Sequence, residues 1–176
     1  MKGYTLVKLL VVMTILSIIG LTSFINLGNF REDKLLDVSW TNLQSLIRAA
    51  QSNASTGVFC SGVGGATWSI EFKDNKTINL NCQAASQQNA INVSTNSLGG
   101  NVQVQSISGN SGCSGAFPTT VNFLPVSKGI TFTDLINTCI APSQSLTVSL
   151  SKAGVQCIDN PSACRTVTIN KGGSIN

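Results

Sequence analysis

The sequence of 176 residues contains no histidine, and only 10% of its residues are charged, against about a quarter in an average globular domain. The lack of histidine excludes Ser-His-Asp and Cys-His catalysis, histidine-ligated metals and histidine pH switches. The cysteines form no Cys-x-x-Cys pair, so a zinc site is also disfavoured. We therefore predict neither an enzyme nor a bound cofactor or metal. Neutral polar residues replace the missing charges, which is typical of a secreted or surface-exposed domain.

Residues 4–27 form an apolar run whose only charge is Lys8. As a helix rising about 1.5 Å per residue it would be roughly 36 Å long, enough to cross a hydrocarbon core of about 30 Å. One alternative is a cleaved secretory signal peptide, but the run is long for one and no small-x-small cleavage site follows it. Another is a buried globular helix, which would need cover on all sides from the remaining residues. We predict a membrane-spanning helix that is retained.

The first residues carry a more specific pattern, in which Met-Lys-Gly precedes Tyr4 and the apolar run begins at once. This start resembles the prepilin signature of type IV pilins and type II secretion pseudopilins, which Thr5, Leu6, Val7, Leu9 and Leu10 also match. The resemblance implies cleavage by a prepilin peptidase between Gly3 and Tyr4 and N-methylation of Tyr4. It further implies a subunit held in the inner membrane with its N-terminus inside, which then joins a periplasmic or extracellular filament by packing its helix against other subunits. The expected assembly residues are Lys8, Leu9, Leu10, Val11 and Val12.

Lys8 departs from the family pattern, which almost always has Glu at this position. The family carboxylate is thought to pair with the free amine of a neighbouring subunit, since a bare ammonium in an apolar bundle is costly. Lys8 instead adds a like charge, whose repulsion at about 4 Å is roughly 1 kcal/mol in water and about 4 kcal/mol at an effective dielectric near 20. Three interpretations remain open: the subunit sits at the filament tip, Lys8 pairs with a carboxylate of a different pilin, or the chain assembles poorly or not at all.

The helical pattern continues beyond residue 27 in a different form. Leu36, Trp40, Leu43, Ile47 and Ala50 recur at spacings of three and four, which predicts one apolar stripe on a helix that ends near Asn53. The first half of the helix is apolar all round, whereas the second half needs a sheet to cover its stripe. We therefore assign residues 1–3 to a leader, 4–27 to the transmembrane and assembly helix, and 28–54 to its amphipathic continuation.

Residues 55–176 alternate short Val-, Ile- and Thr-rich runs with Gly, Asn and Ser turns, which indicates antiparallel strands. Hairpin turns are expected at residues 73–76 and 152–154. The predicted fold is α+β and pilin-like, with a long N-terminal helix packed on antiparallel sheet and stapled by disulfides in a β-rich extracytoplasmic head. The expected strands are residues 58–60, 67–72, 77–82, 90–94, 102–107, 120–124, 130–133, 146–150, 155–158 and 165–169.

Six cysteines in a domain beyond the membrane indicate up to three disulfides, and the sequence alone leaves fifteen pairings open. Cys157 and Cys164 enclose a short polar loop and form our first expected pair. Cys60 with Cys82, and Cys113 with Cys139, are the next. Such bridges matter for a small core, because each typically contributes about 2–4 kcal/mol.

The head resembles the GspH/FimT-like branch of minor pilins in an Ala-rich helix end at residues 48–51, a strand around Trp68, and the segments at residues 123–129 and 147–157. Some members of that branch bind DNA through basic residues near the C-terminus. DNA binding for natural transformation is therefore a second hypothesis, with Lys128, Lys152, Arg165 and Lys171 as candidates, although the net charge of +4 is dilute for nucleic acid. A third is a membrane-anchored, adhesin-like domain that does not polymerise, with contacts in the Gly- and Ser-rich loops.

Overall fold

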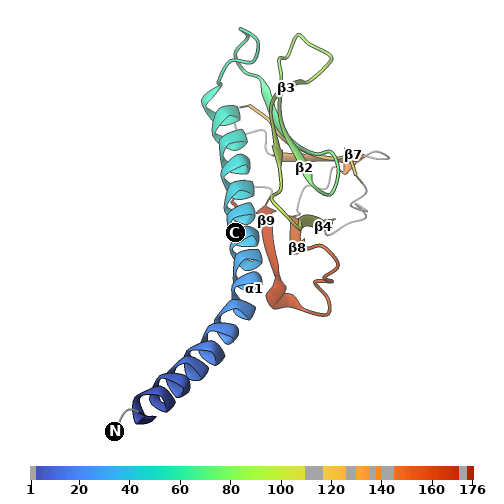
Figure 1. Ribbon diagram of the computed structural model, residues 1–176. Coiled ribbons are helices and arrows are strands. Elements are labelled where there is room, and N and C mark those ends of the chain that lie inside the picture. The colour runs from blue at the N-terminus through green and yellow to red at the C-terminus, as the bar shows by residue number, and fades with distance from the viewer. Residues whose placement is uncertain (1–2, 110–116, 126–129, 135–137, 140–144, 171–173) are drawn as a thin grey trace. The chain divides into compact units, whose positions relative to one another are not determined.

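The computed structural model describes residues 3–109, 117–125, 130–134, 138–139, 145–170 and 174–176. The chain divides into two compact units, Met1–Lys34 and Leu35–Asn176. The first unit is helical. The second combines the C-terminal part of the helix with two antiparallel sheets, so the predicted α+β class is confirmed (Figure 1).

Helix α1 extends over Gly3–Thr56. In its part within the second unit, Leu36, Leu43, Ile47 and Ala50 are almost completely buried, which confirms the stripe predicted from their spacing. Trp40 is half-buried, and its indole nitrogen donates a hydrogen bond to the carbonyl of Thr166 at 3.1 Å. The helix ends where Gly57 takes a φ of +67°, a left-handed conformation that favours glycine and is common just past helix C-termini.

The larger sheet has the strand order β3-β2-β1-β5-β6-β7, and each neighbouring pair of strands is antiparallel. Its central strands alternate in residue type: in β1, Trp68, Ile70 and Phe72 belong to the hydrophobic core, whereas Ser69 and Glu71 face the other side. That second face is also largely covered, since Ser69 is buried. The six strands are β1 (Thr67–Phe72), β2 (Thr77–Gln83), β3 (Ile91–Ser97), β5 (Thr119–Phe123), β6 (Ile130–Asp134) and β7 (Thr138–Cys139).

The smaller sheet has the order β4-β8-β9, with β4 at Val102–Gly109, β8 at Ser145–Lys152 and β9 at Cys164–Asn170. Apolar residues from both sheets join the helix stripe in one core. Between β8 and β9 lies the short 3₁₀ helix η1 (Pro161–Ala163), which belongs to a loop closed by the Cys157–Cys164 disulfide.

Two of the predicted strands and one of the predicted hairpins are wrong. Residues 58–60 form only an isolated bridge between Cys60 and Val63, because Gly57, Ser61 and Gly62 all have positive φ and turn the chain on both sides. Residues 155–158 form no strand, since residues 155–156 are irregular and residues 157–159 form a turn, so the turn at residues 152–154 does not join a hairpin. β8 instead pairs with β9 on one side and β4 on the other. The hairpin at residues 73–76 is confirmed.

The structure contains the two expected disulfides Cys60–Cys82 and Cys157–Cys164. Cys60 and Cys82 are both buried, and their bridge ties the segment after α1 to the core face of β2. The third expected pair cannot be placed, because Cys113 lies outside the described residues.

Candidate functional site

The helix of the first unit has an exposed apolar surface. The large aliphatic side chains between Leu6 and Ile19 are each between 48% and 70% exposed. The two hydroxyls within this stretch bind the helix's own backbone, since Thr14 donates to the carbonyl of Val11 and Ser17 donates to the carbonyl of Met13. A surface of this kind, with its polar groups satisfied internally, is suited to packing against other apolar surfaces.

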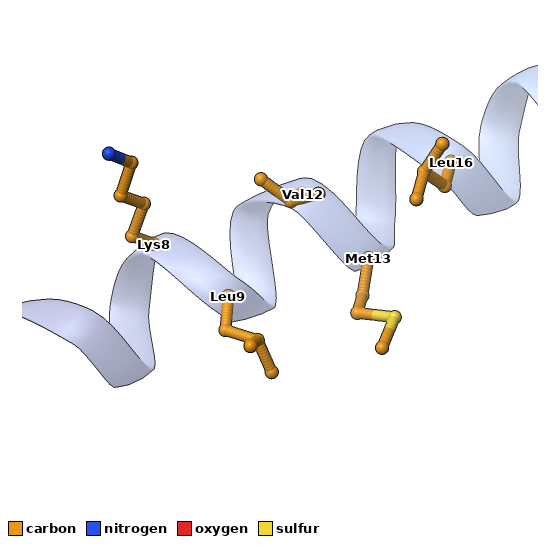
Figure 2. Close-up of a pocket in the computed structure, with 5 residues that line it drawn as sticks. All are labelled: Lys8, Leu9, Val12, Met13 and Leu16. Atoms are coloured by element: carbon orange, nitrogen blue, oxygen red, sulfur yellow. The ribbon is translucent and has the colours of Figure 1, made fainter.

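Lys8 is the one charged group on this stretch. In the view of Figure 2 the side chain of Lys8 points upward from the helix, and those of Leu9 and Met13 point downward. Lys8, Leu9, Val12, Met13 and Leu16 together border a hollow on the helix flank whose accessible lining is apolar. No carboxylate of the described residues pairs with the Lys8 amine. Its charge therefore lies beside an apolar surface. Any molecule that buries Lys8 must also supply a group that pairs with its amine, because an unpaired buried charge is costly.

Gly3 is the first residue of α1, and Tyr4 lies in its first turn. Leu9, Leu10, Val11 and Val12, the other expected assembly residues, are exposed on the helix. Among the residues that the structure describes, no helix meets the length and hydropathy required of a membrane span.

The four basic residues considered for DNA binding are only partly described. Lys128 and Lys171 lie outside the described residues. Lys152 ends β8, and Arg165 lies opposite Leu150 in the β8–β9 ladder, so these two side chains come to the same end of the small sheet. Arg165 is already engaged within the domain: its Nε and Nη2 both lie 2.9 Å from Oδ1 of Asp37. Its charge is therefore neutralised by a residue of α1.

A polar cluster that the sequence did not lead us to expect lies on the face of the large sheet opposite Trp68, Ile70 and Phe72. Oε2 of Glu71 accepts hydrogen bonds from the side-chain amides of Asn79 at 3.0 Å and Asn81 at 3.1 Å. Both asparagines are buried, and their amide oxygens have no hydrogen-bond partner. The signal was present in the sequence, because Ser69 and Glu71 alternate with core residues on one strand as Asn79 and Asn81 do on the next.

This cluster has one carboxylate, and no group of three acidic, cysteine or histidine residues that could hold a metal occurs in the described part of the chain. Its amide nitrogens already point at Glu71. We therefore assign it to the stability of the sheet rather than to chemistry.

Comparison with models of known protein families, with curated proteins and with solved structures found no match for this chain.

Proposed function

We propose that the chain is a structural subunit of a pilin-type filament, either a type IV pilus or a type II secretion filament, with residues 4–27 as its assembly segment. The proposal rests on the order of residues at the N-terminus, where Gly3 and Tyr4 immediately precede an apolar helix with a single charge. The exposed apolar side chains from Leu6 to Ile19 support it, because they need a covering surface that helices of neighbouring subunits would provide.

The membrane step of the proposal rests on the hydropathy of residues 4–27 in the sequence. Before assembly the subunit would be held in the inner membrane, with its N-terminus inside and its disulfide-stapled head outside. Lys8 lies near the cytoplasmic end of this segment, where its aliphatic stem can snorkel and carry the amine to the interface.

Lys8 leads to a more specific proposal, which is that the subunit is located at the filament tip. A subunit in the middle of the filament would bring Lys8 close to the free amine of a neighbour, and the two like charges would repel. A subunit at the tip lacks the neighbour ahead of it. The minor-pilin role follows from this position, since a tip holds few copies.

The first experiment is the mass of the protein extracted from membranes of cells that express a prepilin peptidase. We expect a chain that begins at Tyr4, and a Gly3→Val variant that keeps its leader because the added side chain blocks close approach of the peptidase to the backbone. Lys2→Arg, which preserves the basic charge, is the control and should be cut normally. A wild-type chain that keeps Met1, or one that begins near Arg31, would refute the proposal.

Membrane residence is tested separately by alkaline carbonate extraction. We expect the uncut Gly3→Val variant to stay in the membrane pellet, because the apolar segment and not the processing holds it there. Release of that variant into the supernatant would refute the membrane step while leaving the processing result standing.

A further inference from the structure

Strand β3 is an exposed edge of the large sheet. It has β2 on one side only, and five of its seven residues are exposed, including Ile91 and Val93. In an antiparallel pair about half of a strand's backbone N–H and C=O groups point away from the partner. Among the described residues, none bonds these outward groups of β3.

The edges of the small sheet are treated differently. On β9, the amide of Thr168 donates to the carbonyl of Asn176, and the carbonyl of Thr168 accepts a hydrogen bond from the amide of Asn176. The amide of Asn170 donates to the carbonyl of Ser174. On β4, the amide of Val104 donates to the carbonyl of Asn75 at 2.7 Å. The described residues therefore cover outward backbone groups on both edges of the small sheet, and none of them covers those of β3.

A groove runs beside β3 on its helix side. It has a volume of about 190 Å³ and lies between the flank of α1 and the end of β3. Its lining combines apolar side chains, among them Leu35, Val38 and Leu98, with the polar residues Ser39, Asn42, Asn96 and Ser97, and none of the lining residues is charged. Figure 1 shows β3 next to α1 at the end of the sheet. Val38 is 55% exposed there, so the helix flank continues beyond the sheet that should cover it. The next strand of the sheet would place its inward side chains over this groove.

Charge is absent from this region. No charged residue occurs between Lys76 and Lys128, a stretch that includes β2, β3, β4 and β5. Proteins commonly protect an open edge with charged residues or proline, and β3 has neither. Its one protective device is a bulge at Val93, which leaves residues 94–97 in regular register next to the groove.

We propose that β3 is a docking edge for an extended, uncharged segment of a different polypeptide, which adds a strand to the large sheet and places its alternate apolar side chains in the groove beside Val38 and Leu98. The backbone groups of residues 94–97 supply affinity and the groove selects for apolar residues at every second position. Because neither β3 nor the groove lining carries a charge, we expect the segment to be uncharged where it contacts them. This inference does not depend on the proposed function.

The test uses the full-length protein in detergent solution and a short blocked peptide of alternating valine and threonine. Backbone amide exchange is followed by NMR. We expect the peptide to slow exchange of the outward-facing β3 amides by at least about tenfold, with no change at β9. A peptide of the same sequence that is N-methylated at alternate residues is the control, because it keeps the side chains and loses the donors of one edge.

Two variants test the contribution of the groove to peptide binding separately from that of the β3 backbone. Val38→Asp should weaken peptide binding at least about tenfold, since it places a charge on the apolar lining. Ile158→Asp makes the same type of change at a side chain that is 91% exposed outside the groove, and should leave binding unchanged. Unchanged thermal unfolding of both variants confirms that they fold.

Three results would overturn the proposal: no protection of β3 by the peptide, equal binding of the N-methylated peptide, or no effect of Val38→Asp. Protection of β3 that rises with protein concentration in the absence of peptide would also overturn it, because a second copy would then be the occupant. None of these results bears on N-terminal processing, so failure here leaves the proposed function standing.

Discussion

Arg165 of β9 and Asp37 of α1 join the small sheet to the helix: the Nε of Arg165 donates a hydrogen bond to Oδ1 of Asp37 at 2.9 Å, and its Nη2 forms an ion pair with the same oxygen, also at 2.9 Å. The same guanidinium donates through Nη1 to the carbonyls of Ser162 and Cys164, so it also holds the disulfide loop that precedes β9. The arginine thus connects three parts of the second unit, whereas the aspartate connects only two.

This asymmetry predicts unequal losses on substitution. Asp37→Asn should lower the free energy of unfolding by about 0.5–1 kcal/mol, because both groups are more than a third exposed and the pair is screened. Arg165→Met should cost about 1–2 kcal/mol, since the bonds to Ser162 and Cys164 are lost as well. Chemical denaturation of the two variants measures both values. The Asp37→Asn loss should shrink at about 1 M salt, and a loss independent of salt would contradict the ion-pair explanation.

The two disulfides should differ in what they contribute. Cys60 and Cys82 are 22 residues apart, whereas Cys157 and Cys164 are separated by 7. Because the chain entropy removed from the unfolded state grows with loop length, replacing the first pair by alanines should cost about 1 kcal/mol more than replacing the second. Burial acts in the same direction, since Cys60 and Cys82 are both in the core. Denaturation of the two double variants tests the order, and a larger loss for the Cys157–Cys164 pair would contradict it.

The sequence predicted the parts of the fold that local periodicity determines. The stripe from Leu36 to Ala50 follows the helical repeat, and the hairpin at residues 73–76 follows a turn between two alternating runs. The failures lie where a long-range contact overrides a local pattern. Residues 155–158 have the composition of a strand, yet Gly154 has a φ of +83° and the amide of Cys157 donates to the side chain of Gln105 instead of a neighbouring strand.

The candidate site shows the same division. The apolar surface around Lys8 could be predicted, because its residues are contiguous in the sequence. The open edge of β3 could not, because its exposure depends on the strand order and on which other edges the chain covers. The pairing of Arg165 with Asp37, 128 residues apart, was likewise beyond any local pattern.

The turn between β1 and β2 predicts an acid-dependent loss of stability. The carboxylate of Asp74 accepts hydrogen bonds from the backbone amides of Lys76 at 2.8 Å and Thr77 at 2.7 Å. These bonds, led by that from Lys76, hold the pKa of Asp74 below its ordinary value of 3.8. A depressed pKa in the folded state means that the contribution is present above pH 3.8 and is lost as the pH falls through the folded value.

Asp74→Asn keeps an oxygen that can accept these bonds but cannot titrate. We expect this variant to lack the part of the acid-induced destabilisation that comes from the hairpin, as measured by amide exchange of β1 and β2 across the range below pH 3.8. An exchange profile identical to that of the wild type would contradict the assignment of the titration to Asp74.

Lys8 predicts a change in where the subunit sits within a filament. If the proposed tip position follows from repulsion between Lys8 and a neighbour's free amine, Lys8→Glu should let the subunit incorporate along the filament, where a carboxylate can pair with that amine. Immunogold labelling of filaments measures the distribution. Lys8→Gln is the matched control, because it removes the repulsion without supplying the pair and should give intermediate incorporation. Unchanged labelling at one end for Lys8→Glu would contradict the tip explanation.

Glu71 should matter more for the stability of the large sheet than its half-buried position suggests. Its carboxylate accepts from the amides of two buried side chains, Asn79 and Asn81, whose oxygens are already without partners. Glu71→Ala would leave both amides unbonded, and we expect a loss of about 1–3 kcal/mol in the free energy of unfolding. Glu71→Gln keeps one acceptor oxygen and should lose less stability, because only the charge assistance of the bonds disappears.

The control is Asp159→Ala, which removes an exposed carboxylate and should change the free energy of unfolding by less than about 0.5 kcal/mol. Equal losses for Glu71→Ala and Glu71→Gln would show that the charge, rather than the acceptor, stabilises the cluster.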